Sequence, residues 1–140
     1  PDGLSQDSLH MLMTCEPQIK EIGDLISRTD VLLFGIGTAM RMADQRHIAD
    51  DVRKQLVDNH AVGEALGQYC DMDGKLIYST NNIGLSLPDV AKVPNVIAVA
   101  GGQEKASAII GVMRACQKGI LIIDEQAAEG MRQLLQISAL

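Results

Sequence analysis

Three short apolar runs, each followed by a segment with helical periodicity, constrain the fold of this chain more than any other feature. The runs extend from Val31 to Ile36, from Asn95 to Ala100 and from Ile120 to Ile123. They do not alternate with polar residues, as expected of parallel strands that are covered on both faces. A strand followed by a helix, repeated three times, is typical of βα units. We therefore predict an α/β fold: a Rossmann-like, three-layer parallel sheet with helices on both faces.

Apolar residues spaced three or four apart predict the helices of these units. One helix is expected at about residues 16–28, and another ends near residue 59. The stripes after the second and third runs are Ala106, Ile109, Ile110 and Met113, and Ala127, Met131, Leu134 and Leu135. Asp124 directly precedes the last helix, where its carboxylate can cap the first turn.

The segment between the first two units follows a different pattern. Residues 64–70 and 75–80 are short runs on either side of the sequence Asp71-Met72-Asp73-Gly74. An Asp-Gly pair supplies a turn position with positive φ, so we predict an antiparallel β-hairpin. Residues 81–94 contain Gly and Pro and are predicted as a loop with at most one helical turn.

Charge and cysteine content exclude several classes of protein. A formal net charge of -6 opposes a nucleic-acid interface on this chain, because DNA binding rests on clustered Lys and Arg. Three cysteines without CxxC spacing argue against a disulfide framework or a zinc site, and we interpret them as reduced core thiols. We expect no metal and no cofactor. No apolar run approaches the ~20 residues that span a bilayer, so we expect a soluble, cytoplasmic protein without membrane contact.

Candidate ligand-binding residues follow the predicted strands. Ligands of open parallel sheets bind beyond the carboxyl ends of the strands. The first run ends in Gly35-Ile36-Gly37, and the second is followed by Gly101-Gly102, with Lys105 a few residues further on. Glycine lets the backbone approach an anion closely, and lysine adds positive charge. Each turn by itself is equally consistent with a tight βα connection that binds nothing.

Two charged residues near these turns are further candidates. Arg46 could pair bidentately with a phosphate, and Glu64 could accept hydrogen bonds from sugar hydroxyls or orient Lys105 or Arg46. An ordinary surface arginine and a solvated carboxylate at a strand end fit the spacing equally well.

Four stretches together resemble the sugar-binding effector domain of SorC-type bacterial transcriptional regulators, in the branch of the central glycolytic gene regulators. They are VLLFGIGTAMRMADQR, AVGEALGQYCDMDGKLIYSTNNIGLSLPDV, NVIAVAGGQEKASAII and GILIIDEQAAEGM, in the family's order between Asp30 and Met131. The resemblance implies a fold similar to that of the sugar-phosphate isomerases, used as a sensor. Its effector would be a phosphorylated sugar such as fructose-1,6-bisphosphate.

The same resemblance implies ligand-binding roles for Lys105, Glu64 and Arg46, preceded by Gln45 where the branch often has a second basic residue. It implies that residues 1–140 are the C-terminal part of an effector domain. Operator DNA would be bound by a helix-turn-helix domain that is not in this chain, and we expect a homo-oligomer. The predicted ligand-binding residues are Arg46, Glu64, Lys105, Gly101, Gly102, Gln45, Gly35 and Gly37, with none catalytic.

An enzyme is the alternative that we weigh against the sensor. A phosphosugar isomerase or deaminase would use Glu64 or Asp124 as general base and Lys105 to hold the substrate phosphate. The sequence does not pair a base with an acid, so we predict the sensor and not the enzyme.

Overall fold

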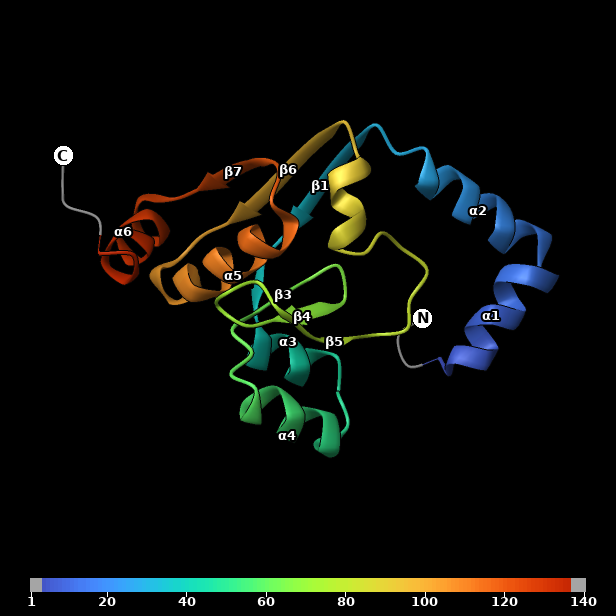
Figure 1. Ribbon diagram of the computed structural model, residues 1–140, viewed down its shortest axis with the longest axis horizontal. Coiled ribbons are helices and arrows are strands. Elements are labelled where there is room, and N and C mark those ends of the chain that lie inside the picture. Colours follow the sequence, from blue (N-terminus) through green and yellow to red (C-terminus); the bar gives the residue numbers. More distant parts are fainter. Residues whose placement is uncertain (1–3, 137–140) are drawn as a thin grey trace.

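The computed structural model describes residues 4–136, in which a parallel and an antiparallel sheet enclose one helix (Figure 1). The parallel sheet has the strand order β1-β6-β7, with β1 at Val31–Gly35, β6 at Asn95–Ala100 and β7 at Ile120–Ile123. These are the three predicted strands, and their parallel pairing is confirmed. Helix α5 (Ala106–Cys116) connects β6 to β7, and α6 (Glu125–Leu134) follows β7, as the apolar stripes predict.

The described helices cover only one face of the parallel sheet. Phe34, Val96 and Ala98 point to this face and belong to one buried cluster with residues of α5, α6 and the short helix η1 (Pro88–Lys92). The other face carries large, exposed apolar side chains: Val31, Leu33, Val99, Ile120 and Ile122. The prediction of helices on both faces is therefore wrong for residues 4–136. The unbroken apolar pattern of the strands marks a second face that the described chain leaves uncovered.

The antiparallel sheet is larger than the predicted hairpin. It has the order β2-β3-β4-β5, with β2 at Gly37–Thr38, β3 at Gly63–Ala65, β4 at Gln68–Cys70 and β5 at Leu76–Ser79. Strands β4 and β5 pair across the Asp-Gly turn as predicted, and Gly74 has a φ of 85°.

The predicted run 64–70 is not one strand but a second hairpin, β3 with β4. Leu66 and Gly67 have φ values of 55° and 78°, so the chain reverses between Ala65 and Gln68. Two successive residues with positive φ form the tight turn that suits a two-residue hairpin.

Helix α5 lies between the two sheets, which explains why seven of its eleven residues are buried. Two glycines allow the antiparallel sheet to approach this helix closely. A Cβ added to Gly63 would lie 2.8 Å from the backbone oxygen of Ala108, and one added to Gly111 would lie 2.4 Å from that of Asp71. The helix thus packs backbone against backbone, and the antiparallel sheet keeps a fixed position relative to the parallel one.

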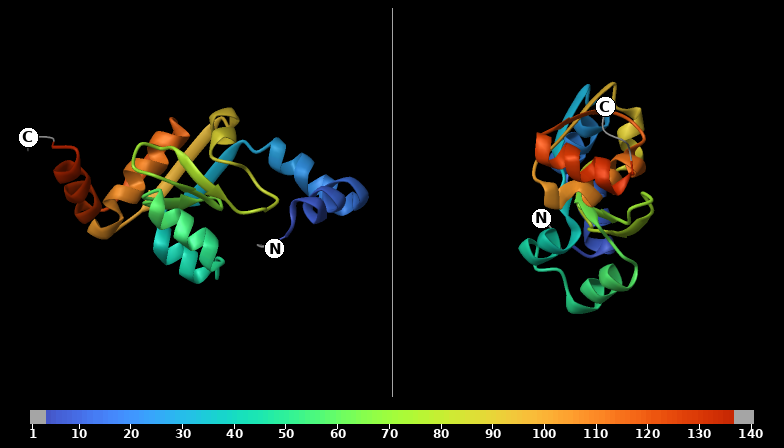
Figure 2. Two further views of the ribbon diagram at one scale, coloured as in Figure 1. Left: turned by 60° about the horizontal axis from the view of Figure 1, so that its bottom comes forward. Right: turned by 90° about the vertical axis from the view of Figure 1, so that its left-hand side faces the viewer.

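Helices α1 (Gln6–Cys15) and α2 (Pro17–Ser27) form a hairpin that extends from the end of the molecule opposite α6 (Figure 2). Neither helix has a buried residue. Asn81 connects the hairpin to the rest of the chain: its Nδ2 donates to the Leu4 carbonyl at 2.8 Å, and its Oδ1 accepts from Gln6 Nε2 at 3.2 Å. The α2 bounds agree with the helix predicted at 16–28.

Helices α3 (Ala39–Gln45) and α4 (Asp50–Asp58) pack on the antiparallel sheet, and α4 ends where a helix was predicted to end. No helix within residues 4–136 is long and apolar enough to cross a membrane. Cys70 and Cys116 are buried as predicted, whereas Cys15 is exposed on α1, so the interpretation of Cys15 as a core thiol is wrong. Burial raises the pKa of the Cys70 thiol to about 12 and that of the Cys116 thiol to about 11.

Candidate functional site

The two sheets meet at the end of β1. Ile36 follows this strand and donates its N–H to the Val99 carbonyl at 3.3 Å. The chain then enters β2, which pairs with β3 so that Gly37 stands opposite Glu64. The Gly35-Ile36-Gly37 turn therefore joins the parallel sheet directly to the strand that carries Glu64.

An open cavity of about 450 Å³ lies at this junction. Its lining residues are Phe34, Gly35, Ile36, Gly37, Thr38, Arg41, Met42, Arg46, Glu64, Leu66, Val99 and Lys105. Aliphatic and aromatic carbon forms much of the wall, and three basic side chains and one carboxylate face the same space. Such a mixture of apolar wall and few polar groups is typical of small-molecule sites.

Five of the eight predicted ligand-binding residues line this cavity: Gly35, Gly37, Arg46, Glu64 and Lys105. Gln45, Gly101 and Gly102 do not line it. Gln45 is exposed at the end of α3, and the two glycines lie beyond β6, outside the cavity wall.

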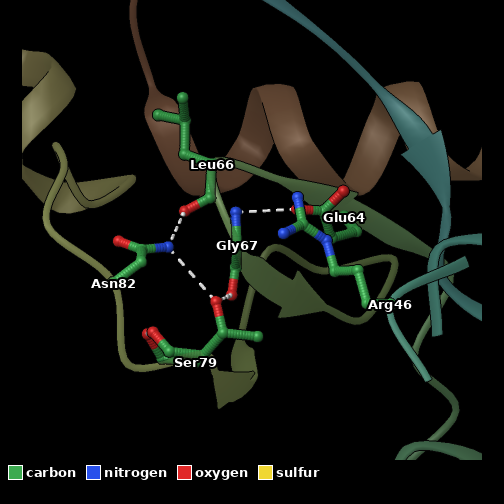
Figure 3. Close-up of polar contacts among 7 residues, drawn as sticks. Arg46, Glu64, Leu66, Gly67, Ser79 and Asn82 are labelled. Atoms are coloured by element: carbon green, nitrogen blue, oxygen red, sulfur yellow. Dashed lines mark hydrogen bonds and ion pairs between the residues drawn. The ribbon is translucent and has the colours of Figure 1, made fainter. Parts of the chain in front are cut away.

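Glu64 is the buried polar centre of the site. Its side chain is only 4% exposed, so the alternative of a solvated carboxylate at a strand end is wrong. Its Oε1 accepts a hydrogen bond from Arg46 Nη2 at 3.2 Å and another from the N–H of Gly67 at 2.7 Å (Figure 3). Glu64 thereby fixes both the arginine and the turn between β3 and β4.

The turn between β3 and β4 is held from its other side as well. Asn82 Nδ2 donates to the Leu66 carbonyl at 3.3 Å (Figure 3). Thr80 donates its N–H to the Gly67 carbonyl at 2.8 Å. A Cβ on Gly67 would lie 2.2 Å from the Asn82 amide nitrogen. Leu66, which lines the cavity, is thus presented by a turn with contacts on both sides.

Asp124 explains why the backbone N–H of Gly102 is not available to a ligand. Its carboxylate accepts from the Gly102 N–H at 2.9 Å and from the Ala127 N–H at 2.8 Å, capping α6 as predicted. These hydrogen bonds, from Ala127 and then from Gly102, hold the pKa of Asp124 below its ordinary value. The glycine turn is bound by a side chain of the protein itself, and Lys105, at the end of the short helix η2 (Gln103–Lys105), still reaches the cavity.

Arg41 is the charged lining residue that sequence reasoning missed. It lies on α3 and its side chain has no hydrogen bond or salt bridge within the described chain. Sequence reasoning identified the GIG turn, and the helix that begins directly after it at Ala39 brings Arg41 to the wall that Thr38 also lines.

A second hollow, of about 370 Å³, lies between the α1-α2 hairpin and residues 82–93. Its wall is mostly apolar, and Lys92, its only basic residue, pairs with Asp89 at 2.7 Å. The junction cavity is therefore the better anion site. Within residues 4–136, no group of three or more His, Cys, Asp or Glu side chains could hold a metal ion.

Comparison with known proteins assigns the family. A family model described as "Putative sugar-binding domain" matches residues 1–133. The chain is 36% identical over 129 residues to the central glycolytic genes regulator of Bacillus subtilis and 38% identical to that of Priestia megaterium. The crystal structure of a SorC family transcriptional regulator from Enterococcus faecalis superposes with a TM-score of 0.82 at 38% identity, over 91% of this chain. This chain belongs to the SorC-type sugar-binding domain family.

The SorC-type domain seen here is shorter than its relatives. It covers 38% of the Bacillus subtilis regulator, 37% of the Priestia megaterium regulator and 52% of the Enterococcus faecalis chain. These relatives are transcriptional regulators and not enzymes. The family predicted from the sequence motifs is thus confirmed, and so is an α/β fold with a three-stranded parallel sheet, whereas the two-sided coverage of that sheet is corrected above.

Proposed function

We propose that this SorC-type domain senses a phosphorylated sugar for a repressor of glycolytic or sugar-metabolism genes, and that the junction cavity is the binding site. The observation that carries this proposal is the placement of buried Glu64 and of Lys105 on the wall of one cavity. A fixed carboxylate is a suitable acceptor for sugar hydroxyls, and an ammonium is a suitable partner for a phosphate. The names of the two glycolytic regulators favour a glycolytic phosphosugar, for which fructose-1,6-bisphosphate is our first candidate.

Sensing requires that the sugar bind more tightly to one state of the regulator than to another. In this proposal the ligand stabilises one arrangement of the junction between the sheets, and a homo-oligomer transmits the change to a separate DNA-binding domain. Operator DNA is contacted through that other domain, because a chain with a net charge of -6 is poorly suited to bind DNA itself. The regulator acts in the cytoplasm. A likeness to the sugar-phosphate isomerase fold stays a prediction.

Isothermal titration calorimetry on the full-length gene product tests the proposal, with fructose-1,6-bisphosphate, fructose 6-phosphate and glucose 6-phosphate as ligands. Lys105→Ala is expected to weaken binding by about 10- to 150-fold, since a charge-assisted hydrogen bond is worth about 1.5 to 3 kcal/mol. Lys20→Ala, on the exposed surface of α2, is the matched control and should bind like the wild type. Absence of binding by all three sugars would overturn the proposal, and full affinity in Lys105→Ala would remove Lys105 from the site.

The enzyme alternative gains no support from the site. Glu64 is engaged by Arg46 and by the Gly67 N–H, and Asp124 by the Gly102 and Ala127 N–H groups. A general base must reach the proton that it abstracts, and Asp124 does not line the cavity.

A further inference from the structure

The three basic residues of the junction cavity are not equivalent. Arg46 donates to the buried Glu64 carboxylate at 3.2 Å and has a side chain only 24% exposed. In contrast, the side chains of Arg41 and Lys105 make no hydrogen bond or salt bridge to any other residue between 4 and 136. Two of the three positive charges are therefore available to a ligand without breaking an existing ion pair.

Electrostatics separates the roles of these residues further. Moving Arg46 onto an incoming anion would leave Glu64 buried with a weakened partner, and uncompensated buried charges are costly. The Glu64 carboxylate also lies against the Arg46 guanidinium and repels a second anion there. Arg41 has no ion pair to break among residues 4–136, and its planar guanidinium can bind a phosphate with two parallel hydrogen bonds.

We propose that Arg41 is an anion-contacting residue of this cavity and that, with Lys105, it sets the preference for phosphorylated over unphosphorylated sugars. Arg46 is instead a positioning residue, which holds Glu64 in place to accept hydrogen bonds from the sugar hydroxyls. The inference rests on the proposed function and names the residues that contact the phosphate of the sugar. It differs from the sequence prediction, in which Arg46 is the phosphate ligand.

Calorimetry on the full-length gene product tests the proposal with fructose 6-phosphate and fructose-1,6-bisphosphate. Arg41→Gln is expected to weaken binding of at least one of these sugars about tenfold or more, and Arg41→Lys is expected to lose less. Arg53→Gln, on the neighbouring helix α4 and outside the cavity wall, removes the same charge and should stay within about twofold of wild type. The thermal midpoint of Arg41→Gln should equal that of wild type, because Arg41 makes no polar contact that folding would lose.

The salt dependence of affinity separates the anion contact from the positioning role. Arg41→Gln should flatten the fall of affinity between 50 and about 500 mM NaCl, because one screened charge pair is gone. Arg46→Gln should weaken binding and, unlike Arg41→Gln, should also lower the thermal midpoint, because buried Glu64 loses its ion-pair partner. An unchanged thermal midpoint in Arg46→Gln, or an unchanged salt slope in Arg41→Gln, would overturn the division of roles.

The outcomes also separate this inference from the proposed function. If wild type binds a phosphosugar and Arg41→Gln binds it equally well, the inference on Arg41 is wrong and the proposed function stands. If wild type binds no phosphosugar, both are wrong.

Discussion

The Glu64 carboxylate joins strand β3 to Arg46 and to the turn at Gly67, so replacing it should lower the free energy of unfolding even without ligand. Glu64→Ala removes the acceptor for Arg46 and for the Gly67 N–H and leaves both donors in a partly buried place. We expect a loss of about 2 to 4 kcal/mol in the free energy of unfolding. Glu64→Gln keeps an oxygen for the Gly67 N–H and should lose about half as much. Urea unfolding measures both, with Glu21→Ala on exposed α2 as control, and an unchanged midpoint in Glu64→Ala would contradict the prediction.

The buried cysteines make stability depend on alkaline pH. The Cys70 and Cys116 thiols have pKa values raised by burial to about 12 and about 11, from an ordinary value of 9.0. Above pH 9 the unfolded chain releases these protons while the folded chain keeps them, so the unfolded state is favoured. Stability contributed by the protonated thiols is thus complete below pH 9 and is lost as pH rises towards 11 to 12.

Denaturant midpoints recorded from pH 8 to pH 11 measure this loss, and a Cys70→Ala, Cys116→Ala double variant is the control for other titrating groups. Its midpoint should fall less steeply than that of wild type. At neutral pH, iodoacetamide should label exposed Cys15 alone until the chain is unfolded. Rapid labelling of all three thiols in the folded chain would show that Cys70 and Cys116 are not buried.

At the scale of residues, sequence reasoning identified three of the four charged residues that line the cavity, but not the full set of hydrogen bonds that holds Glu64 in place. Lys105, Arg46 and Glu64 do line one cavity, because they follow strand ends that the βα pattern already brings together. Sequence reasoning named Arg46 as one of two possible partners of Glu64, but their pairing spans 18 positions and depends on a β-turn that the pattern does not reveal. The same holds for Asp124, which occupies the Gly102 amide from 22 positions away.

At the scale of elements, α5 is the part that both sheets share, and its glycine is the sharpest test of that packing. Gly111→Ala would ordinarily stabilise a helix by up to about 1 kcal/mol. Here the new Cβ would meet the Asp71 carbonyl oxygen at 2.4 Å, so we expect a net loss of about 1 to 3 kcal/mol instead. Gly84→Ala, whose nearest contact would be at 3.4 Å, is the matched control in the same urea titration. A Gly111→Ala variant more stable than wild type would show that the antiparallel sheet does not pack closely against α5.

The elements themselves were largely predictable, and the exceptions have physical reasons. The parallel strands and the amphipathic helices follow from periodicity, and the β4-β5 turn follows from Asp-Gly. The break at Leu66 was not predictable in this way, because a leucine with a φ of 55° is uncommon and is maintained here by Glu64, Thr80 and Asn82. A tertiary network, and not a local preference, makes that turn.

At the scale of the whole molecule, one face of the parallel sheet is left uncovered by residues 4–136. Leu33 and Ile120 are 66% and 64% exposed, and both align with Ile97 across the sheet. Contiguous apolar surface of this kind marks a place that another segment or another molecule covers. The chain covers only about half of the solved Enterococcus faecalis regulator, so its relatives have further residues available for this purpose.

The isolated 140-residue chain is therefore expected to self-associate through this face. The double variant Leu33→Lys, Ile120→Glu places opposite charges on the exposed face without changing the net charge. It should weaken self-association at least tenfold while changing the free energy of unfolding by no more than about 1 kcal/mol, since exposed substitutions are usually mild. Sedimentation velocity over a range of concentrations measures the association, and urea unfolding of monomeric samples measures the stability.

The matched control is Leu32→Glu, one position away on the covered face, where Leu32 packs against the core. Neighbouring strand residues point to opposite faces, so this change should unfold or strongly destabilise the chain. It replaces no residue of the exposed apolar face. If the double variant associates like wild type, the apolar face is not the contact surface and the helical hairpin of α1 and α2 becomes the next place to substitute. If both changes destabilise equally, the face is covered in solution by the chain's own residues, and the two-sided sheet of the original prediction is restored.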